Sequence, residues 1–174
     1  MTKNSTRSGI GGLLLLLILW LTFFAPMYGF GKLTLEFSES IKQFPHLATN
    51  AQFLNYKQYS FIIFAASALI SFAAGIQLWR VHFPESVRFA ILAIWLSVPF
   101  AKILNLAAAL WIYREIAGPS KIEEMILTML GSTFSSCVVA GIWTAYLLRS
   151  ARVKNTYNLP YNQKRSTIKS LTQR

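Results

Sequence analysis

One ionisable side chain, Lys102, lies inside a long apolar stretch of the sequence and is the leading candidate for chemistry. A charged side chain near the centre of a bilayer costs about 2.5–3.5 kcal/mol on insertion scales, and such residues usually serve a function. Asn105 follows about one helical turn later, so both side chains could bind an anionic group or line a pathway. The other apolar stretches contain no Asp or Glu, so the sequence offers Lys102 no counter-ion inside the membrane.

Two structural roles for Lys102 stay open beside this functional one. Pro99 has no N–H to donate to the carbonyl of Trp95, which leaves that acceptor free within a helix. Lys102 lies seven residues after Trp95, hence on nearly the same helix face, and helical side chains point back toward the N-terminus. Its ammonium could therefore bind the Trp95 carbonyl or an adjacent water. Alternatively, the long stem could carry the ammonium outward to the membrane surface.

The remaining reactive residue types form no catalytic arrangement in the sequence. His46 and His82 fall in expected loops, so paired intramembrane histidine ligands for haem are not available. Cys137 is the single cysteine, and this excludes the membrane thiol oxidoreductases, which exchange disulfides between cysteine pairs. We therefore expect no catalytic residue, no cofactor-binding residue and no metal site, and we expect the protein not to be an enzyme.

The composition places these residues in a membrane protein. Of the 174 residues, 54% are hydrophobic and 13% are charged, whereas a soluble domain averages about 25% charged residues. The net charge is +11, and charged and apolar residues are segregated along the chain, which excludes a soluble enzyme and an ordinary DNA-binding domain. Four apolar stretches, about 10–31, 58–79, 89–113 and 125–148, each exceed the roughly 20 residues that cross a bilayer. The predicted fold class is all-α: a polytopic membrane protein with a four-helix transmembrane bundle in residues 1–157.

The distribution of positive charge predicts the orientation of these spans. The N-terminal tail, the turn 80–88 and the segment after Leu148 together carry 11 Lys and Arg, whereas the opposite side carries five. The positive-inside rule then places both termini in the cytoplasm. The segment 158–174 is expected to be a poorly ordered basic tail that contacts anionic lipid headgroups and not nucleic acid. The first stretch lacks a small-residue cleavage signal, so we expect a retained helix and not a signal peptide.

Small residues at four-residue spacing predict how the helices pack. Such residues let two helices approach closely, and membrane helices associate through close packing because lipid tails are themselves apolar. The first stretch has an uninterrupted leucine run instead and is expected to face lipid, with the other three spans tightly packed. The expected packing positions are Ser67, Ser71 and Gly75 in the second span, Ala93, Ser97 and Ala101 in the third, and Ser132, Ser136 and Ala140 in the fourth.

Aromatic and basic residues near the span ends predict anchoring at the membrane interface. The segment 32–57 between the first two spans is expected to be an apolar loop on the membrane surface, with a short helix that begins near Ser38 and is interrupted by Pro45. The expected anchoring residues are Trp79, Trp111, Trp143, Tyr146, Arg149, Arg152 and Lys154.

Three stretches together carry a family resemblance. They are Ile10-Gly11-Gly12-Leu13, His82-Phe83-Pro84, and residues 142–157, which read Ile-Trp-Thr-Ala-Tyr-Leu-Leu-Arg-Ser-Ala-Arg-Val-Lys-Asn-Thr-Tyr. With them the chain resembles the uncharacterised bacterial membrane family called domain of unknown function 2569, whose members look like four-span proteins. The sequence departs from the family pattern at Leu13, Ala145 and Tyr157, where Trp, Pro and Phe would be usual. The resemblance implies the four-span topology and a bacterial inner membrane, and it implies no activity.

The sequence leaves two functional hypotheses open. The leading one is a non-enzymatic integral inner-membrane protein that acts through protein or lipid contacts, such as an assembly factor or a toxin-immunity protein with a protein partner. The alternative is a small transporter or channel component that handles an anionic solute through Lys102 and Asn105. Specific co-purification of a partner would favour the first hypothesis, and solute flux that depends on Lys102 would favour the second.

Overall fold

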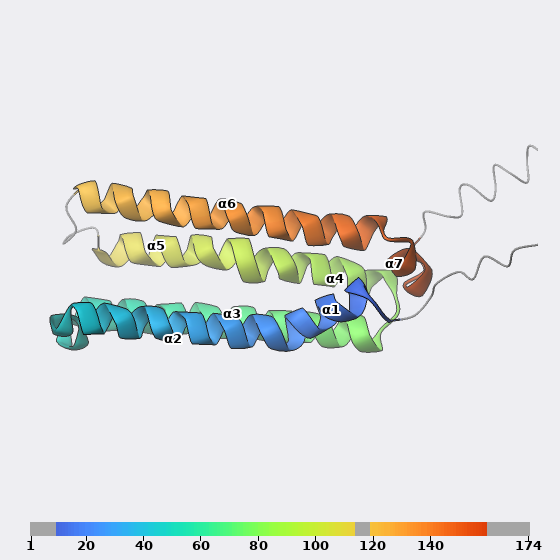
Figure 1. The fold of residues 1–174 in the computed structure, drawn as a ribbon, viewed down its shortest axis with the longest axis horizontal. Coiled ribbons are helices and arrows are strands. Elements are labelled where there is room, and N and C mark those ends of the chain that lie inside the picture. Colours follow the sequence, from blue (N-terminus) through green and yellow to red (C-terminus); the bar gives the residue numbers. More distant parts are fainter. Residues whose placement is uncertain (1–9, 114–118, 160–174) are drawn as a thin grey trace, which may run out of the picture.

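Four long helical rods lie side by side along the long axis of the molecule (Figure 1). The computed structural model describes residues 10–113 and 119–159. Each rod is long and apolar enough to cross a membrane, and no strand occurs among these described residues. The four-span, all-α fold that the sequence predicts is therefore confirmed. The predicted basic tail, residues 158–174, lies outside the described residues from position 160 onward.

Two of the rods are interrupted by π-helical turns. The first rod consists of α1 (Leu13–Leu19), η1 (Trp20–Phe24) and α2 (Ala25–Gln43), and a 3₁₀ turn, η2 (Pro45–Thr49), leads to the second rod, α3 (Ala51–Arg80). The third rod consists of α4 (Pro84–Trp95), η3 (Leu96–Phe100) and α5 (Ala101–Tyr113), and the fourth is α6 (Pro119–Arg149), followed by α7 (Ala151–Thr156). We call the end of the bundle at η2 the hairpin end and the end at α7 the terminal end (Figure 1).

The segment between the first two spans is a helical hairpin and not the surface loop expected from the sequence. The first rod continues far past the expected end of its span, to 31 residues, or about 46 Å at 1.5 Å per residue. It breaks where Pro45 disfavours a helical conformation of Phe44, whose φ is −133°. The next helix begins after Asn50, whose Oδ1 accepts hydrogen bonds from the N–H groups of Gln52 and Phe53 at 3.0 Å each.

Aromatic packing explains why this hairpin segment is so apolar. Phe37 of α2 is only 6% exposed. Its ring centroid lies 5.6 Å from that of Phe53, 5.7 Å from that of Tyr56 and 6.0 Å from that of Phe61, all on α3. Aromatic pairs at such distances add stability beyond their buried area, so these rings close the hairpin end.

The first rod supplies much of the buried core, so the expectation that it is largely lipid-facing is wrong for one face of the helix, whereas several other leucines of the run are exposed as expected. Leu14, Leu17 and Ile18 are at most 1% exposed and pack in one cluster with Leu78 of α3 and Ile94 of α4. In the most apolar part of each rod, 28% of residues are buried in the first and 11% in the fourth. An unbroken leucine run has no polar face, so its pattern could not show which leucines meet the neighbouring rod.

Gly75 is the position that brings α3 against the first rod. A Cβ atom added there would collide with Thr22 Oγ1 and lie 3.3 Å from the carbonyl oxygen of Ile18. The Thr22 hydroxyl is itself held in place, because it donates a hydrogen bond to Ile18 O at 2.7 Å. The close approach at Gly75 is therefore to η1 and α1, and not to the third or fourth span.

Candidate functional site

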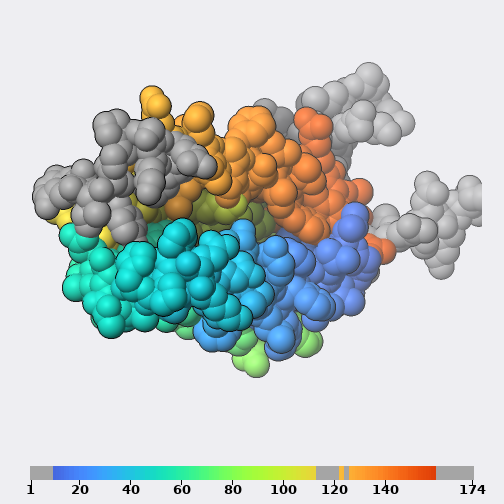
Figure 2. Space-filling model, turned by 60° about the vertical axis from the view of Figure 1, so that its left-hand side comes forward, coloured from blue at the N-terminus to red at the C-terminus, as the bar shows by residue number. Residues whose placement is uncertain are grey.

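A cavity of about 360 Å³ lies inside the bundle, between α2, α3 and the third rod. Figure 2 shows the bundle hollowed between α2 and α6, with α5 recessed behind them. The walls are mostly apolar, and among the described residues α6 contributes only Val139 to the lining. Both π-helical turns border this space, since Trp20 of η1 and Ser97 and Val98 of η3 line it. Turns of this kind occur frequently at functional sites, and the cavity is therefore the candidate site.

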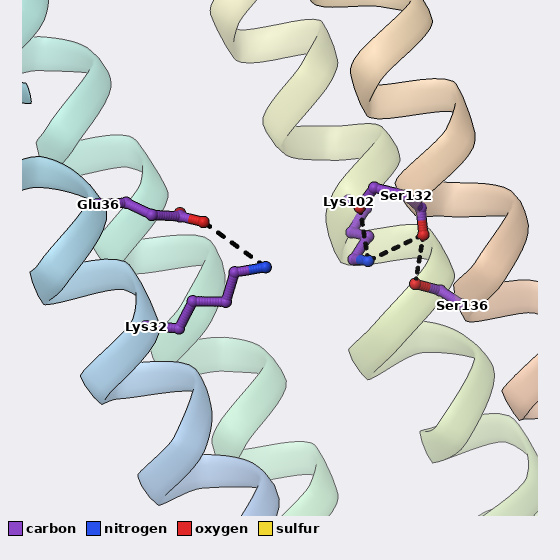
Figure 3. A network of polar contacts seen from close by, with 5 residues as sticks. All are labelled: Lys32, Glu36, Lys102, Ser132 and Ser136. Atoms are coloured by element: carbon purple, nitrogen blue, oxygen red, sulfur yellow. Dashed lines mark hydrogen bonds and ion pairs between the residues drawn. The ribbon is translucent and has the colours of Figure 1, made fainter.

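Lys102 lines the cavity and is held by the neighbouring rod. Its Nζ donates hydrogen bonds to the carbonyl oxygen of Ser132 at 2.9 Å and to the Ser132 hydroxyl at 2.7 Å. Ser136 Oγ donates to the same carbonyl at 2.8 Å (Figure 3). The ammonium thus bonds across to α6, and the contact with the Trp95 carbonyl that the sequence suggested is replaced by this one. Ser132 and Ser136 act here as polar partners and not only as small packing residues.

Asn105 lines the same cavity, and its amide has one satisfied and one unsatisfied group. Its Nδ2 donates to the carbonyl oxygen of Ala101 at 2.9 Å, which fixes the orientation of the amide. Its Oδ1 is buried and has no hydrogen-bond partner among the described residues. A buried acceptor without a donor costs about 1–3 kcal/mol, so a bound molecule that reached this oxygen with a hydrogen-bond donor would relieve that cost.

Two further charged residues reach the cavity from α2. Lys32 and Glu36 both line it and form an ion pair with an N···O distance of 3.6 Å. Figure 3 shows the pair extending from α2 on the side opposite the α5–α6 contact of Lys102. Both side chains are more than half exposed, and an ion pair of that kind holds its partners only weakly. The described charged lining is thus two cations and one anion.

The sequence missed Lys32 and Glu36 because it placed them in a loop. A signal was present, since the apolar positions Gly29, Leu33 and Phe37 continue the helical spacing of the first span past the expected end. In that register the two charged residues lie one turn apart. The predicted span was ended at the length that crosses the hydrocarbon core of a bilayer. The helix is longer than that, so its continuation was not predicted.

Several predicted packing residues belong to the cavity wall. Ser67, Ser71, Ser97 and Ala101 line it together with Lys102. Ser97 Oγ donates to the carbonyl oxygen of Ser67 at 3.1 Å and joins the second rod to the third. The other predicted packing positions and Pro99 lie outside the lining, and among them Gly75, Ala93, Pro99, Ser136 and Ala140 are buried.

A second cluster gathers at the terminal end, where the three stretches of the family resemblance meet. A Cβ atom on Gly12 would lie 2.8 Å from Arg152 Nη1, and Gly12 has φ +60°. The ring of Tyr157 stacks on that of His82, with centroids 5.8 Å apart, and its hydroxyl donates to the carbonyl oxygen of Leu78. Residues distant in the sequence therefore form one contact surface between α7, the α3–α4 turn and the start of the first rod.

The predicted anchoring residues divide into two groups. Trp79 and Trp111 are 57% and 72% exposed, as side chains at a lipid interface would be. Trp143 and Tyr146 pack partly against the core with ring centroids 6.0 Å apart, and Arg152 lies against Gly11 and Gly12. Arg149 is exposed and Lys154 is half-buried.

The comparison with known protein families shows to which family this chain belongs. Residues 7–158 match the family described as Protein of unknown function (DUF2569). The chain belongs to this family. The match spans all three stretches that meet at the terminal end of this DUF2569 protein, and it also spans the cavity. Comparisons with curated proteins and with solved structures found no match. Among the residues that the structure describes, no group of three His, Cys, Asp or Glu side chains could hold a metal ion.

Proposed function

We propose that this protein is a non-enzymatic integral membrane protein that acts through lipid contact and holds one amphipathic molecule in its bundle cavity. The observation that supports the proposal is the pairing of apolar walls with a few polar groups, Lys102, Asn105 and the Lys32–Glu36 pair, in about 360 Å³. Pockets of 300–1,000 Å³ with mostly apolar walls and a few polar groups are typical binding sites for small molecules. Of the contacts expected from the sequence, lipid contact is the one that this cavity favours.

The opening of the cavity supports a ligand that arrives from the bilayer. The hollow between α2 and α6 opens on the lateral surface of the bundle (Figure 2). In a membrane, this lateral surface faces lipid. Trp20 and Tyr28 line the cavity and are 42% and 67% exposed, so apolar surface continues outward from it. An amphipathic molecule can keep its chain in the bilayer while its polar end contacts Lys102 and Asn105.

Filling the cavity tests this proposal. Ala68 lines the cavity from α3, whereas Ala66, two residues earlier, is exposed and lies outside the lining. Native mass spectrometry of protein released from mild detergent should show one retained amphipathic molecule in the wild type and in Ala66→Phe. Ala68→Phe should lose it. Equal retention by both variants, or no retained molecule in the wild type, would overturn the proposal.

The transport alternative uses the same two residues and can be separated by flux. Lys102 and Asn105 do lie together on the cavity wall, which is the arrangement that an anionic solute pathway would need. Liposomes with the reconstituted protein should remain impermeable to small anions if the cavity only holds its ligand. Anion flux that is present in the wild type and lost in Lys102→Met would favour transport instead.

A further inference from the structure

We propose that the cavity takes an amphipathic lipid whose headgroup has a net negative charge and a hydroxyl donor, with the anion at Lys102 and the hydroxyl at Asn105 Oδ1. This inference rests on the proposed function and names the chemical class of its ligand. A lipid with a phosphodiester and a glycerol headgroup belongs to this class. Four features of the described residues support it. Lys102 has a free N–H donor, Asn105 has an acceptor without a donor, the cavity lining has a net positive charge, and Lys102 lies at a particular depth in the bundle.

Lys102 has donor capacity left for an anion. An ammonium group has three N–H donors, and its two hydrogen bonds to Ser132 leave one. None of the described carboxylates lies within ion-pair distance of Lys102. Its orientation is also set before a ligand arrives, because the Ser132 carbonyl that it contacts is bound by Ser136 Oγ as well. A phosphate oxygen would complete the set of partners.

Asn105 requires a donor, which an anionic group alone does not supply. The amide cannot turn to offer Nδ2 to the ligand without losing its bond to Ala101 O. Oδ1 therefore remains the amide group without a partner among the described residues, and because it is buried, a ligand would reach it through a small shift of the side chain that opens it to the cavity. A hydroxyl on the same headgroup would satisfy it. Lys102 and Asn105 are about one turn apart on the same rod, so one headgroup can reach both.

The charge of the cavity discriminates between hydroxyl and ammonium donors. Lys32, Lys102 and Glu36 leave an excess of one cation on the described lining. A headgroup with an ammonium donor, as in phosphatidylethanolamine, carries its own cation beside the phosphate and is neutral overall, so it would leave the one excess cation unbalanced in a low-dielectric space, where an unpaired charge is costly. A headgroup with a hydroxyl donor and one phosphate charge would leave the site neutral.

Depth places the headgroup toward the hairpin end. Lys102 lies 13 residues after Phe89, or about 20 Å along the rod, so it falls in the half of the bundle nearer the α2–α3 hairpin. Trp20 and Ser71 line the cavity closer to the terminal end. A lipid drawn in from the leaflet at the hairpin end would therefore place its headgroup at Lys102, deeper than the headgroups of its neighbours, with its chain along the cavity wall toward the terminal end.

Competition between defined lipids tests the headgroup directly on the wild-type protein. We would measure occupancy by native mass spectrometry with phosphatidylglycerol, phosphatidylmethanol, phosphatidylethanolamine and glycerol 1-phosphate. Phosphatidylmethanol keeps the negative charge and lacks a donor, so phosphatidylglycerol should bind better by on the order of tenfold. Phosphatidylethanolamine should bind more weakly than phosphatidylglycerol, and glycerol 1-phosphate, which has no chain, should not compete.

Variants assign the two headgroup contacts. Asn105→Leu should bind phosphatidylglycerol and phosphatidylmethanol equally, and Lys102→Met should lose the preference for both over phosphatidylethanolamine, while Lys102→Arg keeps it. Asn55→Leu and Lys42→Met change the same residue types at exposed positions outside the cavity and should leave the preferences unchanged.

Each contrary result overturns a defined part of the inference. If the wild type bound phosphatidylglycerol and phosphatidylmethanol equally, the hydroxyl contact would be wrong. If it bound phosphatidylethanolamine as well as phosphatidylglycerol, the requirement for a net negative charge would be wrong. Competition by glycerol 1-phosphate would assign the site to a free phosphate ester and not to a lipid. The proposed function would survive the first two results, since it fails only if Ala68→Phe leaves the bound amphiphile in place or the wild type holds none.

Discussion

The hydroxyl of Tyr157 donates a hydrogen bond to the carbonyl oxygen of Leu78, across 79 positions of the sequence. Leu78 lies in the last turn of α3, where carbonyl groups have no partner within their own helix. The buried tyrosine supplies that partner and fastens the segment after α6 to the end of the second rod. The family pattern usually has phenylalanine at this position, where this chain has Tyr157.

Tyr157→Phe should therefore lower the free energy of unfolding by about 1–2 kcal/mol, since it leaves the Leu78 carbonyl buried without a donor. The aromatic ring and its stacking on His82 should be kept. Thermal unfolding in detergent, followed by tryptophan fluorescence, measures the change. Tyr59→Phe, at a position that is 55% exposed, is the matched control and should unfold like the wild type. An unchanged midpoint in Tyr157→Phe would mean that water replaces the hydroxyl.

The same contact predicts a loss of stability in alkaline solution. Burial raises the pKa of Tyr157 from 10.0 to about 12. Between these two values the unfolded chain releases the phenolic proton while the folded protein retains it. The unfolded state then binds fewer protons, so stability falls as the pH rises from about 10 to about 12. The stabilisation due to this group is fully present below pH 10. The decline should be shallower in Tyr157→Phe; an identical pH dependence in both proteins would contradict the raised pKa.

The leucine run and the length of the first rod show what the sequence could and could not predict. Four spans followed from apolar length alone, because a helix that crosses a bilayer needs about 20 apolar residues. The buried face of Leu14, Leu17 and Ile18 did not follow, since leucine suits lipid and protein equally. Lys102 was found from its charge, whereas its bond to Ser132 depends on how the third and fourth rods align.

Gly75→Ala should destabilise the protein where the same change at Gly141 does not. The added methyl at Gly75 would collide with Thr22 Oγ1, and overpacking of this kind costs about 1–3 kcal/mol. Nothing lies within 4 Å of a Cβ at Gly141, and alanine is the better helix former there. Unfolding midpoints in one detergent would compare the two variants. Equal midpoints would show that α3 and the first rod separate freely at this point.

Lys102→Met should fold and lose no more than about 3.5 kcal/mol of stability, because two effects oppose each other. The variant loses hydrogen bonds from a charged donor, each worth about 1.5–3 kcal/mol. It also removes a charge whose insertion into the membrane costs about 2.5–3.5 kcal/mol. Ser132 O keeps its hydrogen bond from Ser136, so the packing of α5 on α6 should persist. Helical content by circular dichroism and the unfolding midpoint are the measurements. A variant that fails to fold would make Lys102 a structural tie between the third and fourth rods, whereas a folded variant that loses its bound lipid would make it a binding residue.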